Sequence, residues 1–380
     1  MSNSLLELEA LGQSVWLDDI DREQLRSGLF QRLIDEDGLL GATGNPTIFE
    51  HAITHSNTYD EQMQQLITEG KSAQEIYEAL AMTDERVVAD LLRPIYERTE
   101  GQDGFVSIEV SPYLAQDTEG TLSEVRRFWD TIDRTNLMVK IPATPAGIPA
   151  IRQALTEGIN INITLIFSIE NYRQVAEAYL SALEERSAKG QDIGRIASVA
   201  SFFVSRVDVL VDNLLEGKMK AVGISVEQQK LKALQGKIAI ANARLAYQEF
   251  KRLFSGPRFE ALKQRGARVQ RPLWASTSTK NLAYRDVMYV EDLIGPDTVN
   301  TMPLTTIERF REHGRVRFSI EDHLLESTAQ LAALADVGLH FDQVTQQLQE
   351  EGVQKFIDSF HTLFECIDNK RKALQQERGV

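Results

Sequence analysis

A chain of 380 residues, 42% of them hydrophobic, can bury a large core and has room for one barrel-sized domain or two to three ordinary ones. The 41 basic and 56 acidic residues give a net charge of −15, which argues against nucleic acid or an anionic membrane as the main partner. One cysteine excludes an internal disulfide framework, and the chain shows neither a signal-like N-terminus nor a run of about 18 apolar residues. We therefore expect a soluble cytoplasmic protein in which any phosphate site is a local basic patch.

The first hundred residues begin with leucines at roughly helical spacing, which predict a short helix over residues 2–13. A strand-like run follows over 14–19 and ends in two acids. A helix is expected over 21–38, closed by Gly38. A second short strand within 39–47 ends in the chain breaker Gly44-Asn45-Pro46, and the chain is then helical in period to about residue 100.

The rest of the chain continues the alternation of strand-like and helical runs. Helices are expected near 122–131, 147–158 and 170–189, two or three more over 206–270, and helices from 306 to the end. The further strands are predicted over residues 105–112, 137–144, 160–168, 196–205, 271–279 and 298–306.

Eight strands that alternate with helices favour parallel βαβ units, because a crossover between parallel strands needs a connection of helix length. The sequence therefore predicts an α/β protein, a closed (β/α)8 barrel of the TIM-barrel class with additional N-terminal and C-terminal helices. No G-x-G-x-x-G fingerprint follows the first strand, which removes the main support for an open doubly wound sheet. We expect a single domain over residues 1–380, with a barrel core at about 12–315 and a helical tail at about 316–380.

Lys140 is a single charge inside the apolar run Leu137 to Thr144. A strand alternates its faces, so Lys140 points away from Val139 and Ile141. It is either a gatekeeper on an exposed strand edge or a buried lysine. Burial lowers the pKa of a lysine, and the neutral amine can then attack a carbonyl group and form a Schiff base.

Polar side chains interrupt other strands that should read as continuous apolar runs. Asn160, Asn162 and Thr164 share one face of their strand, which predicts a wet or substrate-lined side. Asp18 and Glu109 stand near the C-terminal ends of theirs, and each alone could be a helix cap or an ion-pair partner. The C-terminal strand ends carry the chemistry of barrel enzymes, where we expect these residues to meet: Asp18, Asn45, Glu109, Lys140, Asn162 and Thr164.

A lysine with two carboxylates suits carbonyl chemistry through an iminium, in which the amine attacks and the acids move protons. That chemistry needs no metal and no cofactor. His51 and His55 have i,i+4 spacing, but they lack the glutamate of H-E-x-x-H and an evident third ligand, so the metal alternative is weak.

Two basic residues follow late strands, where barrels commonly bind phosphate. Arg206 comes just after the sixth strand, and Lys280 comes after a hydroxyl-rich end of the seventh. Taken alone, Arg206 also fits an ion pair with Asp208 or Asp212 on its own helix.

Five segments in order resemble the transaldolase family, in its long bacterial and cyanobacterial form. The segment GATGNPTIF is similar to the family's T-[ST]-N-P-[ST] motif, and LMVKIPATPAG resembles its Schiff-base lysine motif. The segments NITLIFS, ASFFVSRVD and WASTSTKN resemble the motifs that follow, and the resemblance covers roughly residues 12–310.

The resemblance implies transfer of a dihydroxyacetone unit from sedoheptulose 7-phosphate to glyceraldehyde 3-phosphate, which gives erythrose 4-phosphate and fructose 6-phosphate. It implies that Lys140 is the Schiff-base lysine, that Asp18 takes the substrate's hydroxyl proton during cleavage, and that Glu109 handles a catalytic water with Thr164. The implied substrate-hydroxyl residues are Asn45, Asn162 and Ser201, and the implied phosphate residues are Arg206, Ser278 and Lys280.

Two positions depart from the family pattern. Gly44 precedes Asn45 where the family has Thr or Ser, so a hydroxyl beside the substrate is missing. Lys280 stands where shorter members have arginine, which replaces a bidentate clamp by a point charge.

Two other functions remain open from the sequence. A Schiff-base aldolase would release dihydroxyacetone to water, and a phosphosugar-binding protein would keep Arg206 and Lys280. The combination of Lys140, Asp18 and Glu109 counts against the binding protein. The sequence assigns no purpose to the residues beyond about 310.

Overall fold

The computed structural model describes residues 3–44, 49, 52–53, 56–222 and 226–377. Eight parallel strands pair in chain order, and β1 pairs with β8, so the sheet closes into a barrel as the sequence predicts. The strands are β1 Gln13–Leu17, β2 Gly41–Thr43, β3 Phe105–Glu109, β4 Leu137–Pro142, β5 Ile161–Ile166, β6 Ser198–Phe203, β7 Arg271–Ala275 and β8 Thr298–Met302.

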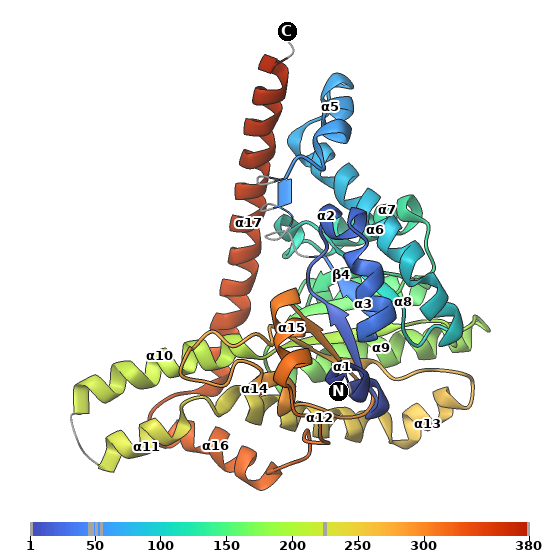
Figure 1. The fold of residues 1–380 in the computed structure, drawn as a ribbon. Helices are drawn as coiled ribbons and strands as arrows, with labels where there is room; N and C mark the ends of the chain where they lie inside the picture. Colours follow the sequence, from blue (N-terminus) through green and yellow to red (C-terminus); the bar gives the residue numbers. More distant parts are fainter. Residues whose placement is uncertain (1–2, 45–48, 50–51, 54–55, 223–225, 378–380) are drawn as a thin grey trace.

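Helices surround the barrel and cover its strands from outside (Figure 1). This arrangement explains why the strands are almost entirely buried. The helices are α1 Ser4–Ala10, α2 Arg22–Arg26, α3 Leu29–Asp37, α5 Asp60–Thr68, α6 Ala73–Arg98, α7 Thr118–Ile132, α8 Gly147–Glu157, α9 Ile169–Ala188, α10 Ser205–Val222, α11 Val226–Leu234, α12 Ile238–Phe254, α13 Pro257–Lys263, α14 Met288–Glu291, α15 Leu304–His313, α16 Leu324–Asp336 and α17 Phe341–Glu377, with a 3-10 turn at Pro112–Leu114.

Three segments differ from the sequence-based prediction. The helix expected over 21–38 is divided, because Gly28 adopts φ +73° between α2 and α3, although Gly38 does end α3 with φ +68°. The described part of residues 206–270 contains four helices instead of two or three. The eighth strand ends at Met302 and α15 begins at Leu304, while residues 314–323 lie outside the regular helices.

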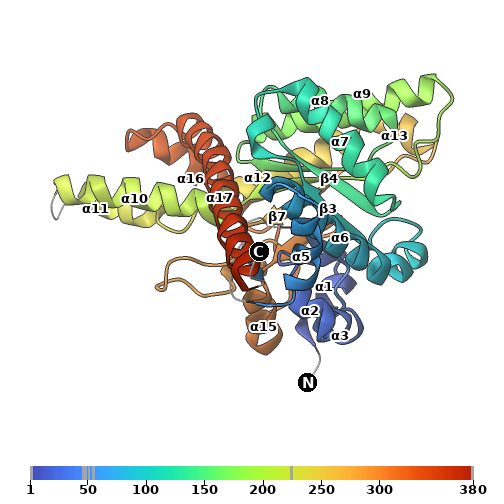
Figure 2. The ribbon, with the colours of Figure 1, turned by 90° about the horizontal axis from the view of Figure 1, so that it is seen from above.

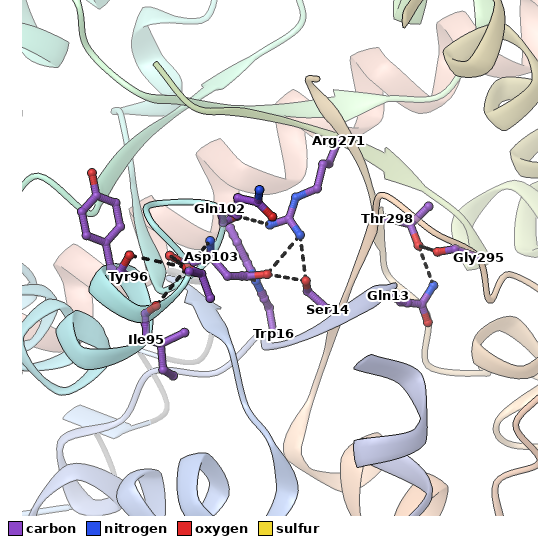
Figure 3. Close-up of polar contacts among 11 residues, drawn as sticks. Gln13, Ser14, Trp16, Ile95, Tyr96, Gln102, Asp103, Arg271, Gly295 and Thr298 are labelled. Carbon is purple, nitrogen blue, oxygen red and sulfur yellow. Dashed lines mark hydrogen bonds and ion pairs between the residues drawn. The ribbon is translucent and has the colours of Figure 1, made fainter. Parts of the chain in front are cut away.

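A polar network lies at the N-terminal end of the barrel (Figure 3). Asp103, just before β3, accepts hydrogen bonds from Ser14 Oγ, from Trp16 Nε1 at 2.7 Å and from Arg271 Nη1 at 3.0 Å. Arg271 also donates to Ser14 Oγ at 2.7 Å and to the carbonyl oxygen of Gln102 at 3.0 Å. The network joins β1, β7 and the segment before β3, so it ties together strands that are far apart in sequence.

Trp16 is fully buried, and its ring occupies the space beside β2. A Cβ atom placed on Gly41 would lie 2.6 Å from Trp16 Nε1, which is too close for a real side chain. Position 41 therefore requires glycine for close approach of the strand to the indole ring.

The helix α17 begins beside α10 and extends along the C-terminal side of the barrel, past α6 to α5 (Figures 1 and 2). The buried residues in its described part recur at helical spacing and are Val344, Thr345, Leu348, Gly352, Phe360, Leu363 and Ile367. Lys370 Nζ ties the far part of α17 to α5 through Asp60 at 2.6 Å and the carbonyl oxygen of Ser56 at 2.7 Å. Among the described residues no helix is long and apolar enough to cross a membrane.

Candidate active site

A cavity of about 580 Å³ opens at the C-terminal ends of the strands. The strands and the loops that follow them supply part of its wall, and the helices α10 and α17 supply the remainder. Its lining residues are Asp18, Thr43, Lys140, Thr164, Ser201, Phe203, Ser205, Arg206, Val209, Leu210, Asn213, Ala275, Ser276, Ser278, Lys280, Thr301, Pro303, Leu348, Glu351, Lys355 and Phe356. The cavity therefore lies at the end of the barrel where the sequence predicts the chemistry.

Lys140 lines this cavity and forms an ion pair with Glu109, which does not itself line it. The strands β3 and β4 bring the two residues opposite each other, and Nζ lies 3.2 Å from Oε2. Lys140 is only 7% exposed, so it is not the gatekeeper of an exposed strand edge. Burial raises the pKa of the Glu109 carboxyl, and the neighbouring Lys140 ammonium opposes that shift.

Asp18 follows β1 and also lines the cavity, whereas Asp19 does not. Its Oδ1 accepts a hydrogen bond from Thr43 Oγ1 at 2.8 Å, and the Thr43 hydroxyl is 3.1 Å from that of Thr301. Burial raises the pKa of Asp18, while Lys140, the Thr43 hydroxyl and more distant cations oppose the shift. A partly desolvated carboxylate beside a lysine is suited to proton transfer.

The polar side chains at positions 160, 162 and 164 lie in different surroundings. Thr164 lines the cavity, and its buried hydroxyl has no hydrogen-bond partner among the described residues. Asn162 donates to Ser107 Oγ at 3.0 Å and accepts from Ser201 Oγ at 2.7 Å inside the barrel. The prediction of a wet face was wrong for Asn160, whose amide bonds the backbone of residues 135, 137 and 197 at the opposite strand end.

Thr164 is placed in the cavity by an irregular strand. The pairing of β5 with β6 shifts between Ile163 and Ile166, and Leu165 adopts a positive φ of 59°. A bulge of this kind redirects a neighbouring side chain, which is a common device beside active sites.

A second group of cations lies at the other side of the cavity. Arg206 and Lys280 both line it, and Lys280 Nζ donates to Ser278 Oγ at 2.8 Å. The alternative ion pair of Arg206 was wrong: Asp208 instead accepts from Ala239 N and Tyr289 Oη. Asp212 likewise accepts from the backbone N–H of residue 236 and the hydroxyl of residue 284.

Arg206 keeps donor capacity for an anion. Its Nη1 is buried and has no hydrogen-bond partner in the described part of the chain. Its guanidinium instead stacks on the ring of Phe203, with Cζ 4.9 Å from the ring centroid. Burial lowers its pKa, which Asp18 and Glu109 oppose.

The helix α17 contributes a wall that the sequence analysis did not assign. The Phe356 ring centroid lies 5.8 Å from Lys140 Nζ and 5.9 Å from Arg206 Cζ, and Lys355 and Glu351 also line the cavity. Gln349 Nε2 anchors the helix by donating to the carbonyl oxygen of Ala143 at 2.9 Å. An apolar stripe along residues 344–367 was the available signal, but periodicity alone does not say what that stripe covers.

Three residues of the sequence-based interpretation, Asn45, His51 and His55, lie outside the described residues. Within the described ones, no cluster of three or more histidine, cysteine, aspartate or glutamate side chains could hold a metal ion.

A closed barrel whose C-terminal cavity is lined by an aspartate and by a buried lysine paired with a carboxylate is typical of (β/α)8 enzymes that use a lysine at the reaction centre. The model of the Transaldolase/Fructose-6-phosphate aldolase family matches residues 15–367. The chain is 47% identical to a transaldolase of Trichodesmium erythraeum over 98% of this chain and 99% of that protein. It is also 46% identical to a transaldolase of Acidothermus cellulolyticus over the whole of both chains. The chain belongs to the transaldolase/fructose-6-phosphate aldolase family.

Proposed function

We propose that this chain is a transaldolase that transfers a dihydroxyacetone unit from sedoheptulose 7-phosphate to glyceraldehyde 3-phosphate, in the non-oxidative pentose phosphate pathway. The observation that carries the proposal is the buried Lys140, paired with Glu109 at 3.2 Å, on one cavity with Asp18, Arg206 and Lys280. The full-length relatives named transaldolase support the same activity.

In this proposal Lys140 Nζ attacks the ketone carbon of the donor, and loss of water gives an iminium. Asp18 accepts the proton of the hydroxyl group beyond the bond that breaks, so that carbon–carbon cleavage releases the first aldose. The enamine left on Lys140 then attacks the acceptor aldehyde, Asp18 returns its proton to the new hydroxyl group, and water releases the new ketose. Glu109 and Thr164 position the water of these steps.

The substrate phosphate lies at the Arg206 side, where Ser278 and Lys280 supply a hydroxyl and a second cation. Asn45, Asn162 and Ser201 are the proposed residues for the sugar hydroxyls. A lysine at position 280 binds phosphate as a point charge and needs Ser278 for direction. The proposal takes residues 1–380 as one domain in the cytoplasm, with neither nucleic acid nor membrane as partner, which the net charge of −15 supports.

The test is borohydride trapping with fructose 6-phosphate, followed by intact mass and peptide mapping. We expect a sugar adduct on the Lys140 peptide and no adduct in Lys140→Met. An untrapped protein that still binds fructose 6-phosphate would reject the Schiff-base mechanism and favour a phosphosugar-binding protein.

The family description also names fructose-6-phosphate aldolase. The two activities differ in the fate of the enamine, which the transferase passes to an aldehyde and the aldolase protonates. We expect little free dihydroxyacetone from fructose 6-phosphate alone and rapid transfer once erythrose 4-phosphate is added. Accumulation of dihydroxyacetone at the rate of the transfer reaction would assign the aldolase activity instead.

A further inference from the structure

A second, much smaller cavity lies behind Glu109, and its volume of about 20 Å³ is enough for one water molecule. Two carboxyl groups border it, Glu109 from β3 and Glu85 from α6. The described lining residues are Ile20, Gly44, Phe49, Tyr77, Ala81, Asp84, Glu85, Ile108 and Glu109.

Glu85 is one of two neighbouring buried acids, with Asp84, on a side of α6 whose other buried neighbours are apolar. Ala81, Val88 and Ala89 lie one turn away on either side and are buried, and Glu85 is only 4% exposed. Its Oε2 has no hydrogen-bond partner in the described part of the chain. A buried polar atom without a partner is costly, so a water in the adjoining cavity is its natural ligand.

The neighbouring acid Asp84 provides a comparison. It is equally buried, but Arg22 Nε donates to it at 2.7 Å and Tyr59 Oη donates at 3.0 Å. These contacts explain Asp84 as a structural ion pair between α2 and α6. Among the described residues Glu85 has no such ion pair, so its burial needs a different reason.

Gly44 makes room for the Glu85 carboxyl. A Cβ atom on Gly44 would lie 2.7 Å from Glu85 Oε1 and 3.1 Å from the carbonyl oxygen of Ser107. The carboxyl of Glu85 therefore fills the space that a side chain at position 44 would take. The polar group that the sequence lacks at Gly44 is supplied from α6.

Glu85 is suited to donate a hydrogen bond rather than to add a negative charge. Burial raises its pKa well above the ordinary value, and Asp84 adds to the shift while Lys140 opposes it. A raised pKa favours the protonated carboxyl, the form that carries one O–H donor.

We propose that Glu85 is a positioning residue for Glu109, and that a single water in the 20 Å³ cavity joins the two carboxyl groups. The inference rests on the proposed function, in which Glu109 directs the water that forms and breaks the iminium. A donor behind Glu109 holds its carboxylate ionised and oriented toward Lys140. Glu85 lines the small cavity and does not line the active-site cavity.

The test compares Glu85→Gln, Glu85→Met and Glu85→Ala in the transfer from fructose 6-phosphate to erythrose 4-phosphate. Gln keeps a neutral donor, so we expect kcat within about threefold of the original. Met and Ala remove the donor and leave different volumes, and we expect kcat about tenfold lower with the KM of both substrates unchanged. Thermal unfolding shows which of the two apolar variants is folded, and that one is used.

Glu78→Leu is the matched control, because Glu78 lies two turns earlier on α6 and pairs with Arg127 away from the cavity. We expect it to keep the original kcat. A folded Met or Ala variant with unchanged kcat, or a Gln variant as slow as these, would overturn the inference. Borohydride trapping of the unaltered protein distinguishes failure of this inference from failure of the proposed function. If the sugar adduct on Lys140 forms, only the role of Glu85 is wrong. If it does not form, the proposed function itself fails.

Discussion

The ionisation of Asp18 sets the low-pH limit of activity in the proposed reaction. It must be a carboxylate to accept the substrate proton, and burial raises its pKa from the ordinary 3.8. Activity therefore falls as the pH drops through this raised value, above the pH at which an exposed aspartate protonates. We expect the acid limb of kcat/KM to lie above pH 3.8, and Asp18→Asn to lose activity by about 10²–10⁴-fold. An acid limb at the ordinary aspartate value would contradict this role.

Asp208 offers a separate pH test, of stability instead of activity. It is 1% exposed, and burial raises its pKa to about 7 from 3.8. Between these values the folded protein binds more protons than the unfolded one, so the free energy of unfolding decreases as the pH rises from about 4 to about 7. Asp208→Asn keeps an acceptor for Ala239 N and does not titrate. Urea unfolding should show the stability of the variant, relative to the original, increasing over that window; parallel profiles would refute the assignment.

A candidate functional residue could be predicted from the sequence where its polar side chain interrupts an apolar strand. Lys140, Glu109 and Thr164 stand out because the strands of a covered barrel are otherwise hydrophobic. Glu85 and Phe356 could not be found in this way. A glutamate in the run Thr-Asp-Glu-Arg resembles any exposed helix surface, and a phenylalanine on an amphipathic helix resembles a core residue.

At the scale of the element, α17 changes from an unassigned tail to part of the cavity wall. Removal of the Phe356 ring would let water reach Lys140 and Arg206. We expect Phe356→Ala to lower kcat/KM for fructose 6-phosphate about tenfold, since the two cation–ring contacts are each worth about 0.5–2 kcal/mol. Phe364→Ala is the control, because Phe364 packs on Tyr77 and does not line the cavity. Equal activity of both variants would show that α17 only supports the fold.

The elements themselves were predictable to the extent that they depend on local pattern. The strand and helix order follows from periodicity, but the division at Gly28 depends on one left-handed backbone conformation within an amphipathic run. The extra helices between Ser205 and Lys263 pack on one another, and periodicity does not reveal where such a run is divided.

For the whole molecule, the network around Asp103 fixes the barrel end opposite the active site (Figure 3). Asp103→Ala would leave Arg271 and Trp16 Nε1 without their common acceptor, which we expect to lower the free energy of unfolding by about 3 kcal/mol. The KM for fructose 6-phosphate should not change, because the network lies at the far end of the strands. The exposed control Asp336→Ala should be neutral. A changed KM with unchanged stability would show that the two ends of the barrel are coupled.

Closure of the barrel was predictable from eight alternating units, since no open-sheet fingerprint competes with it. The contacts that close it were not, because Asp103 and Arg271 are 168 residues apart and meet only in the folded chain. For the same reason, local sequence patterns do not indicate that residues 348–356 line the cavity at the C-terminal ends of the strands.

The position of α17 in the chain has a consequence for biosynthesis. The ribosome makes all eight strands before it reaches Phe341, and the 37 residues of α17 then need about 2–7 s at ordinary elongation rates. During that interval the nascent chain already contains Lys140, Asp18 and Glu109. The part of the cavity wall that α17 supplies has not yet been made. The cavity wall is thus completed only after α17 has been made, when the strands have had time to assemble.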